Sequence, residues 1–269
     1  MKVKSICALG MVLLLFVYKV APLCFAQNEE GHRTVVQYPT GTLRVEFEPG
    51  YYALWLGKAT AYRDELVFDF SKETTSVEAS VVQQGIDVRY RDDLSGTIYG
   101  VVHFELPTDE ESMLDVHTRF HSESELSSTF LKVITEEIFK DTAGMFGSVE
   151  VYLSVGEQLE YWIHEQLKKG KYKVNFKELS ETDGMTGMMS TKERPVLELD
   201  GAGSPIHVET ELQETGITVT DYRILDKEFE QKVMEQISQI SEERFERMEA
   251  KMKATREAYK EREKDRFGQ

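Results

Sequence analysis

The chain has 269 residues, 41% of them apolar and 10% aromatic, which is enough to build a buried core in one or two domains. Acidic side chains outnumber basic ones by 48 to 32, and a surface with a net charge of −16 repels phosphate backbones, which argues against nucleic-acid binding. Both cysteines, Cys7 and Cys24, lie near the N-terminus, so the rest of the chain has neither disulfides nor thiolate metal ligands.

The first element is an apolar leader, residues 1–26. From residue 6 to residue 26 it carries one charge, Lys19, and as a helix this stretch would be about 30 Å long, close to the thickness of the hydrocarbon layer of a bilayer. We predict a single-pass transmembrane anchor here. The side chains expected to contact lipid are Ile6, Leu9, Val12, Leu13, Leu14, Leu15, Phe16 and Val17.

A cleaved signal peptide is the alternative for the same leader, because Cys24 and Ala26 have the small side chains and the spacing of a cleavage site. The residues alone do not decide between the two. Both alternatives agree on orientation, since Lys2 and Lys4 precede the apolar stretch at 6–26 and two glutamates follow it. The body of the chain is therefore predicted to lie outside the cytoplasm, on a periplasmic-like side.

Short strand-like segments follow between residues 29 and 106, with turns between them, as in an antiparallel meander. They read EEGHRTVVQY, LRVEFE, YYALWLG, ELVFDF, SVEASVVQ, IDVRY and GTIYGVVHFEL. In YYALWLG, the side chains of Tyr51, Tyr52 and Trp55 are of the kinds that favour a membrane interface. We predict a membrane-interface contact at these three residues; the alternative is a strand buried on both faces.

Helical spacing replaces alternation after residue 122. Ser122 and Glu125 fit a capping box before an apolar stripe that begins at Leu126, and a second amphipathic helix is predicted over residues 155–169. Two further strands read KYKVNFKEL and GITVTDYRIL. Between them, residues 181–195 are rich in Gly, Met and polar residues, and we predict a mobile loop whose methionines either contact a partner or are disordered.

The last segment, residues 226–266, contains no Gly or Pro and is dense in Glu, Lys and Arg. A narrow apolar stripe runs along it, which is typical of a helix that needs a partner helix. We therefore predict an oligomerisation helix. The stripe consists of Phe229, Val233, Ile237, Ile240, Phe245, Met248 and Met252.

Catalytic and metal-binding motifs are incomplete. His164 and Glu165 begin the HExxH zinc motif, but Lys168 stands where the second histidine is required, so a solvent-facing pair on a helix is expected. His117 and His121 are four residues apart, yet no cluster of carboxylates or cysteines completes a metal shell. Nucleophile elbows, phosphate-binding loops and dinucleotide fingerprints are missing from the sequence. We predict no enzymatic activity, no cofactor and no metal site.

The order of these segments resembles the SPFH, or band 7, superfamily of prohibitins, stomatins, flotillins and bacterial regulators of membrane-bound AAA proteases. Four stretches between residues 29 and 249 carry the resemblance. They are EEGHRTVVQ, IDVRYRDDLSGTIYGVVHFEL, FLKVITEEIFKDTAGMF and GITVTDYRILDKEFEQKVMEQISQISEERFERM. Two features depart from the family pattern: residues 181–204 make a long connection, and the C-terminal helix is shorter than in cage-forming members.

The resemblance implies an α+β fold with an N-terminal transmembrane helix, an SPFH domain of antiparallel strands with packed helices, and a long C-terminal helix or coiled coil. The domains would be the leader at 1–26, the SPFH domain at 27–225 and the oligomerisation helix at 226–269. Within the SPFH domain, residues 30–107 would be rich in strands, 109–170 helical, and 171–225 strands and loop. Because members generally keep their apolar segment, the resemblance favours an anchor over a signal peptide.

The resemblance also implies a function. It predicts a membrane scaffold that oligomerises laterally, contacts membrane lipid, and organises or regulates a membrane protein such as an AAA protease. The partners would be further copies of this chain or a related SPFH chain, with no nucleic acid. The alternative is an exported soluble enzyme, or a monomeric protease-inhibiting module, released by signal-peptide cleavage.

Overall fold

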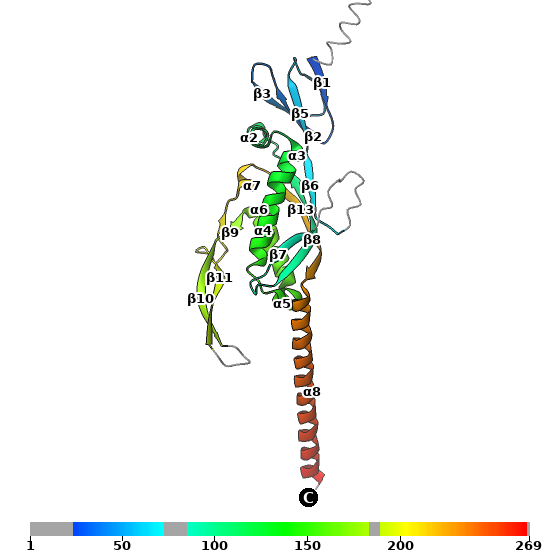
Figure 1. Ribbon diagram of the computed structural model, residues 1–269, viewed down its shortest axis with the longest axis vertical. Coiled ribbons are helices and arrows are strands. Elements are labelled where there is room, and N and C mark those ends of the chain that lie inside the picture. The colour runs from blue at the N-terminus through cyan, green and yellow to red at the C-terminus, as the bar shows by residue number, and fades with distance from the viewer. Residues whose placement is uncertain (1–23, 73–84, 183–188, 268–269) are drawn as a thin grey trace, which may run out of the picture.

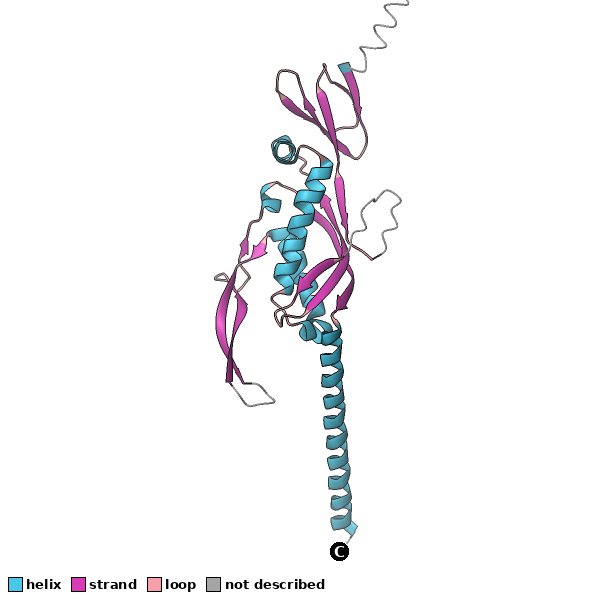
Figure 2. Ribbon diagram, viewed as in Figure 1, coloured by secondary structure: helices cyan, strands magenta, loops and turns pink. Residues whose placement is uncertain are grey.

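The computed structural model describes residues 24–72, 85–182 and 189–267. The molecule is elongated (Figure 1): a small group of strands forms one end, a sheet with packed helices forms the middle, and a long helix projects from the other end. Figure 2 shows that strands and helices are mixed throughout the middle part.

The strand group at the end, here called the tip module, comprises residues 24–63. Its strands are β1 (Phe25–Asn28), β2 (His32–Gln37), β3 (Leu43–Glu46), β4 (Gly50–Ala53) and β5 (Lys58–Arg63). A three-stranded sheet has the order β3-β2-β5, and β1 pairs separately with β4. Buried Asn28 joins the two parts, because its amide donates to the backbone carbonyls of His32, Glu46 and Glu48.

The body is built on an antiparallel sheet. Its strands are β6 (Glu65–Asp69), β7 (Ile86–Arg89), β8 (Ser95–Glu105) and β13 (Thr218–Phe229), in the order β13-β8-β6, with β7 also paired to β8. Burial alternates strictly along β8, as the period of two in its sequence predicts. Its inner face, with Ile98, Val102 and Phe104, belongs to the core.

Helices cover that inner face (Figure 1). They are α2 (Glu110–Phe120), α3 (Glu123–Glu125), the π-helical turn η1 (Leu126–Leu131), α4 (Lys132–Ala143), α5 (Ser148–Glu150), the π-helical turn η2 (Val151–Val155), α6 (Gly156–Lys169) and α7 (Glu211–Glu214). The hydroxyl of Ser122 accepts from the backbone N–H of Glu125, 3.2 Å away, which is one half of the predicted capping box, whereas the N–H of Ser122 donates to the carbonyl of Phe120. The predicted second helix begins one residue later than expected, at Gly156.

The prediction of a mobile loop over residues 181–195 is wrong at both of its ends. Strands β10 (Val174–Thr182) and β11 (Met189–Leu197) form a hairpin that lies along the side of the body (Figure 1). Its base adjoins the short pair β9 (Lys171–Tyr172) and β12 (His207–Val208). Residues 174–179, the VNFKEL part of the predicted strand, pair with residues 192–197 of β11. This pairing makes a strand of residues whose Gly- and Met-rich surroundings indicated a loop.

The C-terminal helix α8 (Gln231–Phe267) begins later than the predicted residue 226, because β13 continues to pair with β8 as far as Phe229 opposite Gly96. Phe229 is therefore a strand residue and not part of the helix. The stripe on α8 itself starts at Val233, which is fully buried.

The predicted fold class is wrong in its N-terminal transmembrane helix. Across the described residues, no helix is both apolar and long enough to span a bilayer. Phe25 and Ala26, assigned to the leader, instead lie in β1, where they pair with Ala53 and Tyr52. Strand pairing satisfies their backbone groups, so the leader cannot extend as a helix to residue 26. The eight predicted anchor side chains, from Ile6 to Val17, lie outside the described residues, as does the predicted strand SVEASVVQ.

Candidate functional site

A strained turn stands at the end of the tip module. Trp55 and Leu56 both have positive φ, +46° and +65°, and the N–H of Gly57 donates to the carbonyl of Leu54 at 2.8 Å. Two consecutive positive φ values are the backbone pattern of a type I′ turn, which ordinarily takes Asn-Gly. A bulky side chain in this conformation costs about 1–2 kcal/mol. The fold therefore holds Trp and Leu here at a cost in stability.

Four large apolar side chains are exposed around this turn. The exposed fractions are 83% for Tyr51, 61% for Trp55, 66% for Leu56 and 55% for Phe25. The rings of Phe25 and Trp55 lie 6.4 Å apart, so the side chains gather rather than scatter. We call Phe25, Tyr51, Trp55 and Leu56 the apolar tip. An exposed cluster of this kind marks a contact surface more often than an accident of packing.

The structure separates the three predicted interface residues. Tyr51 and Trp55 lie in the apolar tip, but Tyr52 is only 8% exposed, because successive side chains of a strand point to opposite faces. Burial, followed by the charge of Glu46, raises the pKa of Tyr52. Tyr52 therefore packs inside the tip module.

Sequence reasoning missed Phe25 and Leu56. Phe25 was assigned to the leader, and nothing in YYALWLG signals that Leu56 leaves the strand for a left-handed turn. The turn is fixed by tertiary contacts instead: the N–H groups of Leu54 and Trp55 both donate to the carbonyl of Cys24, at 2.7 and 3.2 Å. The residue just before β1 thus anchors the turn that carries the tip.

Arg33 joins the tip module to the body. Its side chain is 7% exposed, and its guanidinium donates to the backbone carbonyls of Leu106 and Pro107. It also lies 3.2 Å from the carboxylate of Asp64 and 3.7 Å from that of Glu105. Arginine suits this position because its planar fork can serve several acceptors at once.

Two further contacts cross the same boundary. The hydroxyl of buried Tyr62, on β5, lies 2.7 Å from Nδ1 of His117 on α2. The carboxylate of Glu123 accepts from Nε and Nη2 of Arg63 at 2.8 and 2.6 Å. The tip is therefore held in a fixed orientation on the body.

The predicted oligomerisation stripe divides into three parts. Phe229 and Val233 belong to the body, where Phe229 stacks on Tyr90 with ring centroids 5.7 Å apart and Val233 is buried. Ile237 and Ile240 are partly covered. The distal residues Phe245, Met248 and Met252 are 65%, 57% and 59% exposed. The distal half of α8 therefore presents an apolar surface that this chain does not cover.

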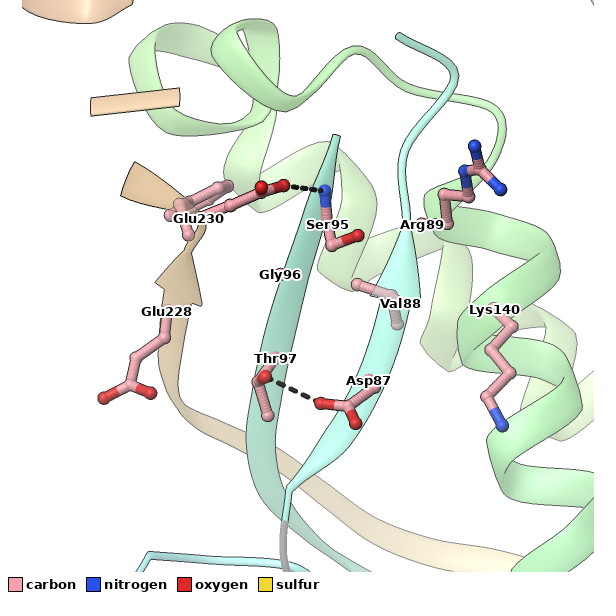
Figure 3. A pocket seen from close by; sticks show the side chains of 10 residues that line it. Asp87, Val88, Arg89, Ser95, Gly96, Thr97, Lys140, Glu228 and Glu230 are labelled. Atoms are coloured by element: carbon pink, nitrogen blue, oxygen red, sulfur yellow. Dashed lines mark hydrogen bonds between the residues drawn. The ribbon is translucent and has the colours of Figure 1, made fainter. Parts of the chain in front are cut away.

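A pocket of about 620 Å³ lies where β13 passes into α8, bordered by β7 and β8 (Figure 3). The hydroxyl of Thr97 donates to Asp87 at 2.8 Å, and the N–H of Ser95 donates to Glu230 at 3.4 Å. Arg89 and Lys140 lie on its far side (Figure 3). Arg89 and Lys140 pair with Asp93 and Glu136, which lie outside the pocket lining.

His164 and Glu165, the start of the incomplete zinc motif, make contacts within the body. His164 lies with its ring edge-on to Tyr222, at 5.6 Å, and Glu165 accepts from Lys169 and Tyr172 at 2.6 and 2.7 Å. The prediction of a solvent-facing His164–Glu165 pair is therefore wrong, because both side chains are partly buried. Among the described residues, no three His, Cys, Asp or Glu side chains are grouped to hold a metal.

Of the methionines predicted as a contact surface, Met185 and Met188 lie outside the described residues, and Met189 opens strand β11.

Comparison with known proteins adds no assignment: no protein-family model matches this chain, and no curated protein matches it.

Proposed function

We propose that this chain is a scaffold of the SPFH kind that rests on a membrane surface by its apolar tip and assembles laterally through α8. It acts by contact rather than by catalysis. Many copies side by side would define a patch of membrane and restrict the access of a membrane protein, such as an AAA protease. The partners are membrane lipid and further copies of this chain or of a related one.

The observation that carries this proposal is the strained exposure of Trp55 and Leu56. Proteins keep unfavourable backbone conformations mainly where the site has a use for them. Aromatic side chains that combine an apolar body with a polar end are favoured at the interface between lipid and water, and Tyr51 and Trp55 are of this kind. The apolar tip therefore has both the composition and the placement of a lipid contact.

The positions of the two exposed apolar surfaces also support the proposal. The tip module and the free end of α8 lie at opposite ends of the molecule (Figure 1). With the tip on a bilayer, α8 would point away from it and would be free to meet other proteins. Lys2 and Lys4 before the leader, with Glu29 and Glu30 after it, favour the extracytoplasmic face for the body.

Vesicle binding tests the membrane contact. We would replace Trp55→Asn together with Leu56→Gly, which suits the type I′ turn, and measure sedimentation of the full chain with phosphatidylcholine vesicles. Removing two interfacial side chains that contribute roughly 1–2 kcal/mol each should weaken binding by about 30- to 800-fold. Leu225→Asn is the matched control, because Leu225 is 58% exposed but lies on the body. Equal binding by both variants would refute the membrane contact.

Particle mass tests the assembly. Replacing Ile237→Lys and Ile240→Lys places two charges on the stripe of α8 while leaving the buried Val233 in place. We expect large assemblies to become small ones on a sizing column with light scattering. An unchanged mass would show that the part of α8 around Ile237 and Ile240 does not make the assembly contact.

A further inference from the structure

Two cavities, of about 450 and 330 Å³, lie end to end along the outer side of α4. Both are lined by α4 residues and both include Lys171, so together they form one surface, here called the α4 groove. Its opposite wall is the base of the β10–β11 hairpin at one end and the start of α7 at the other. Val133 on α4 and Phe176 on β10 are 55% and 70% exposed, so the groove has apolar walls that nothing in the described chain covers.

The groove lining contains three carboxylates, Glu137, Asp141 and Glu211, and two lysines, Lys140 and Lys171, so acidic groups outnumber basic ones by one. The amine of Lys171 is bonded to both Glu137 and Asp141, at 2.6 and 2.7 Å, so one cation serves two carboxylates. Burial alone would lower the pKa of Lys171, but these two bonds outweigh it and raise the pKa. A third carboxylate, Glu211, stands at the start of α7 on the groove wall. A basic, apolar ligand would complement this surface.

The outer part of α8 supplies apolar and basic side chains in two neighbouring segments. Phe245, Met248 and Met252 are spaced i, i+3 and i+7, the pattern with which a helix fills a groove. Residues 251–267 contain seven Lys or Arg and four Asp or Glu, in a chain whose net charge is −16. Residues 231–250 have the opposite balance, with three basic and five acidic side chains. The basic charge of α8 is thus concentrated toward its free end.

The distal helix of one chain has no access to its own groove. Figure 1 shows α8 running straight away from the body, whereas α4 lies within the body and the β10–β11 hairpin lies at its side. A second copy of the chain can therefore supply the helix that one copy cannot place in its own groove.

We propose that α8 from Phe245 outward, with Phe245, Met248 and Met252 as its apolar contacts, docks in the α4 groove of a second copy. This inference rests on the lateral assembly proposed above and names the surfaces that make it. The contact joins two different surfaces, so a pair of copies keeps one free groove, on one copy, and one free helix, on the other. Such contacts repeat into rings or open chains instead of stopping at a dimer.

The experiment measures the mass of the full-length protein in detergent by light scattering over a range of concentrations. Val133→Lys places a charge in the groove, and we expect at least a tenfold weaker association. Val67→Lys is the matched control, because Val67 is 52% exposed on the far face of the sheet, on β6. The control should assemble as the wild type does.

A charge swap tests the pairing itself. Glu211→Lys and Lys253→Glu should each weaken association several-fold, and the chain that carries both changes should regain it. Failure of the double variant to recover would overturn the proposal, as would an unchanged mass for Val133→Lys. If Phe245→Lys dissociates the particles while Val133→Lys does not, α8 pairs with α8 and only this inference fails. If neither variant has an effect, the lateral assembly itself is wrong.

Discussion

Single buried polar residues decide how the tip module is held. Asn28 ties β1 to the neighbouring strands, and Arg33 ties the whole module to the body. Neither role is visible in the sequence, where both residues stand in an ordinary strand-like stretch. The guanidinium of Arg33 meets carbonyl groups more than seventy residues away along the chain, and only the folded topology brings them together.

Arg33→Met should destabilise the protein by about 2–4 kcal/mol, because it leaves two buried carbonyls without their donor and Asp64 without its ion-pair partner. The free energy of unfolding from urea denaturation measures this. Arg44→Met is the control, since Arg44 is 62% exposed and pairs only with Glu46, and such surface pairs contribute about 0–1 kcal/mol. A similar loss of unfolding free energy in both variants would mean that Arg33 contributes no more to stability than an exposed arginine does.

The Tyr62–His117 contact predicts a dependence of stability on pH. Burial first, then the charges of His121 and Lys58, lower the pKa of His117 below its usual 6.5. The unfolded chain therefore takes up the proton at a higher pH than the folded chain does. As the pH falls from about 6.5 through the folded-state pKa, the unfolded state is favoured and stability is lost.

The variant His117→Gln can still bond to Tyr62 but does not titrate, so its urea midpoint should fall less than that of the wild type between pH 8 and pH 5. Tyr62→Phe is the companion variant. It removes the hydrogen bond but keeps the buried imidazole, so it should lower stability at every pH and retain the slope. A wild-type slope in His117→Gln would assign the pH dependence to other groups.

At the scale of elements, the sequence is informative where one face of an element is buried. Strict alternation places β8, and the apolar spacing after Ser122 places the helical run through α4, because each pattern is imposed by a single core. The sequence pattern is misleading where pairing with another strand, and not the pattern of the segment itself, determines the structure. Strand β1 was hidden at the end of an apolar run, β5 has the weakly patterned sequence KATAYR, and the β10–β11 hairpin lies in a Gly- and Met-rich stretch.

The same limit applies to the candidate site. Aromatic composition pointed to Tyr51 and Trp55, whereas Leu56 joins them only because Cys24 fixes the turn from outside the segment. On α8, spacing alone suggested one continuous stripe from Phe229 to Met252. The structure divides it, because β13 extends to Phe229 before the helix begins.

The turn at Trp55 and Leu56 predicts opposite effects on stability and on membrane binding. Trp55→Asn with Leu56→Gly should relieve the left-handed strain and stabilise the protein by about 1–2 kcal/mol. For a chain of this size, that corresponds to a rise of roughly 2–8 °C in the melting temperature. Calorimetry checks it beside the vesicle assay. A lower melting temperature would show that the two side chains pack productively in the free protein.

At the scale of the whole molecule, charge is distributed unevenly. The tip module, residues 24–63, contains four Lys or Arg and four Asp or Glu, so it is formally neutral, while the whole chain carries −16. The excess of acidic groups thus lies beyond the module that the proposal places on the bilayer. An elongated molecule with a neutral end can approach a membrane end-on while its acidic body stays away from anionic headgroups.

This arrangement predicts an inverted salt dependence. With vesicles containing anionic lipid, binding should strengthen several-fold as salt rises from 10 to 200 mM, because the Debye length falls from about 30 Å to less than 10 Å and screens the repulsion of the acidic body. With neutral phosphatidylcholine vesicles, binding should change little over the same range. Sedimentation of the full chain with both vesicle types measures this. Binding that weakens with salt on anionic vesicles would mean that a basic segment, and not the apolar tip, makes the contact.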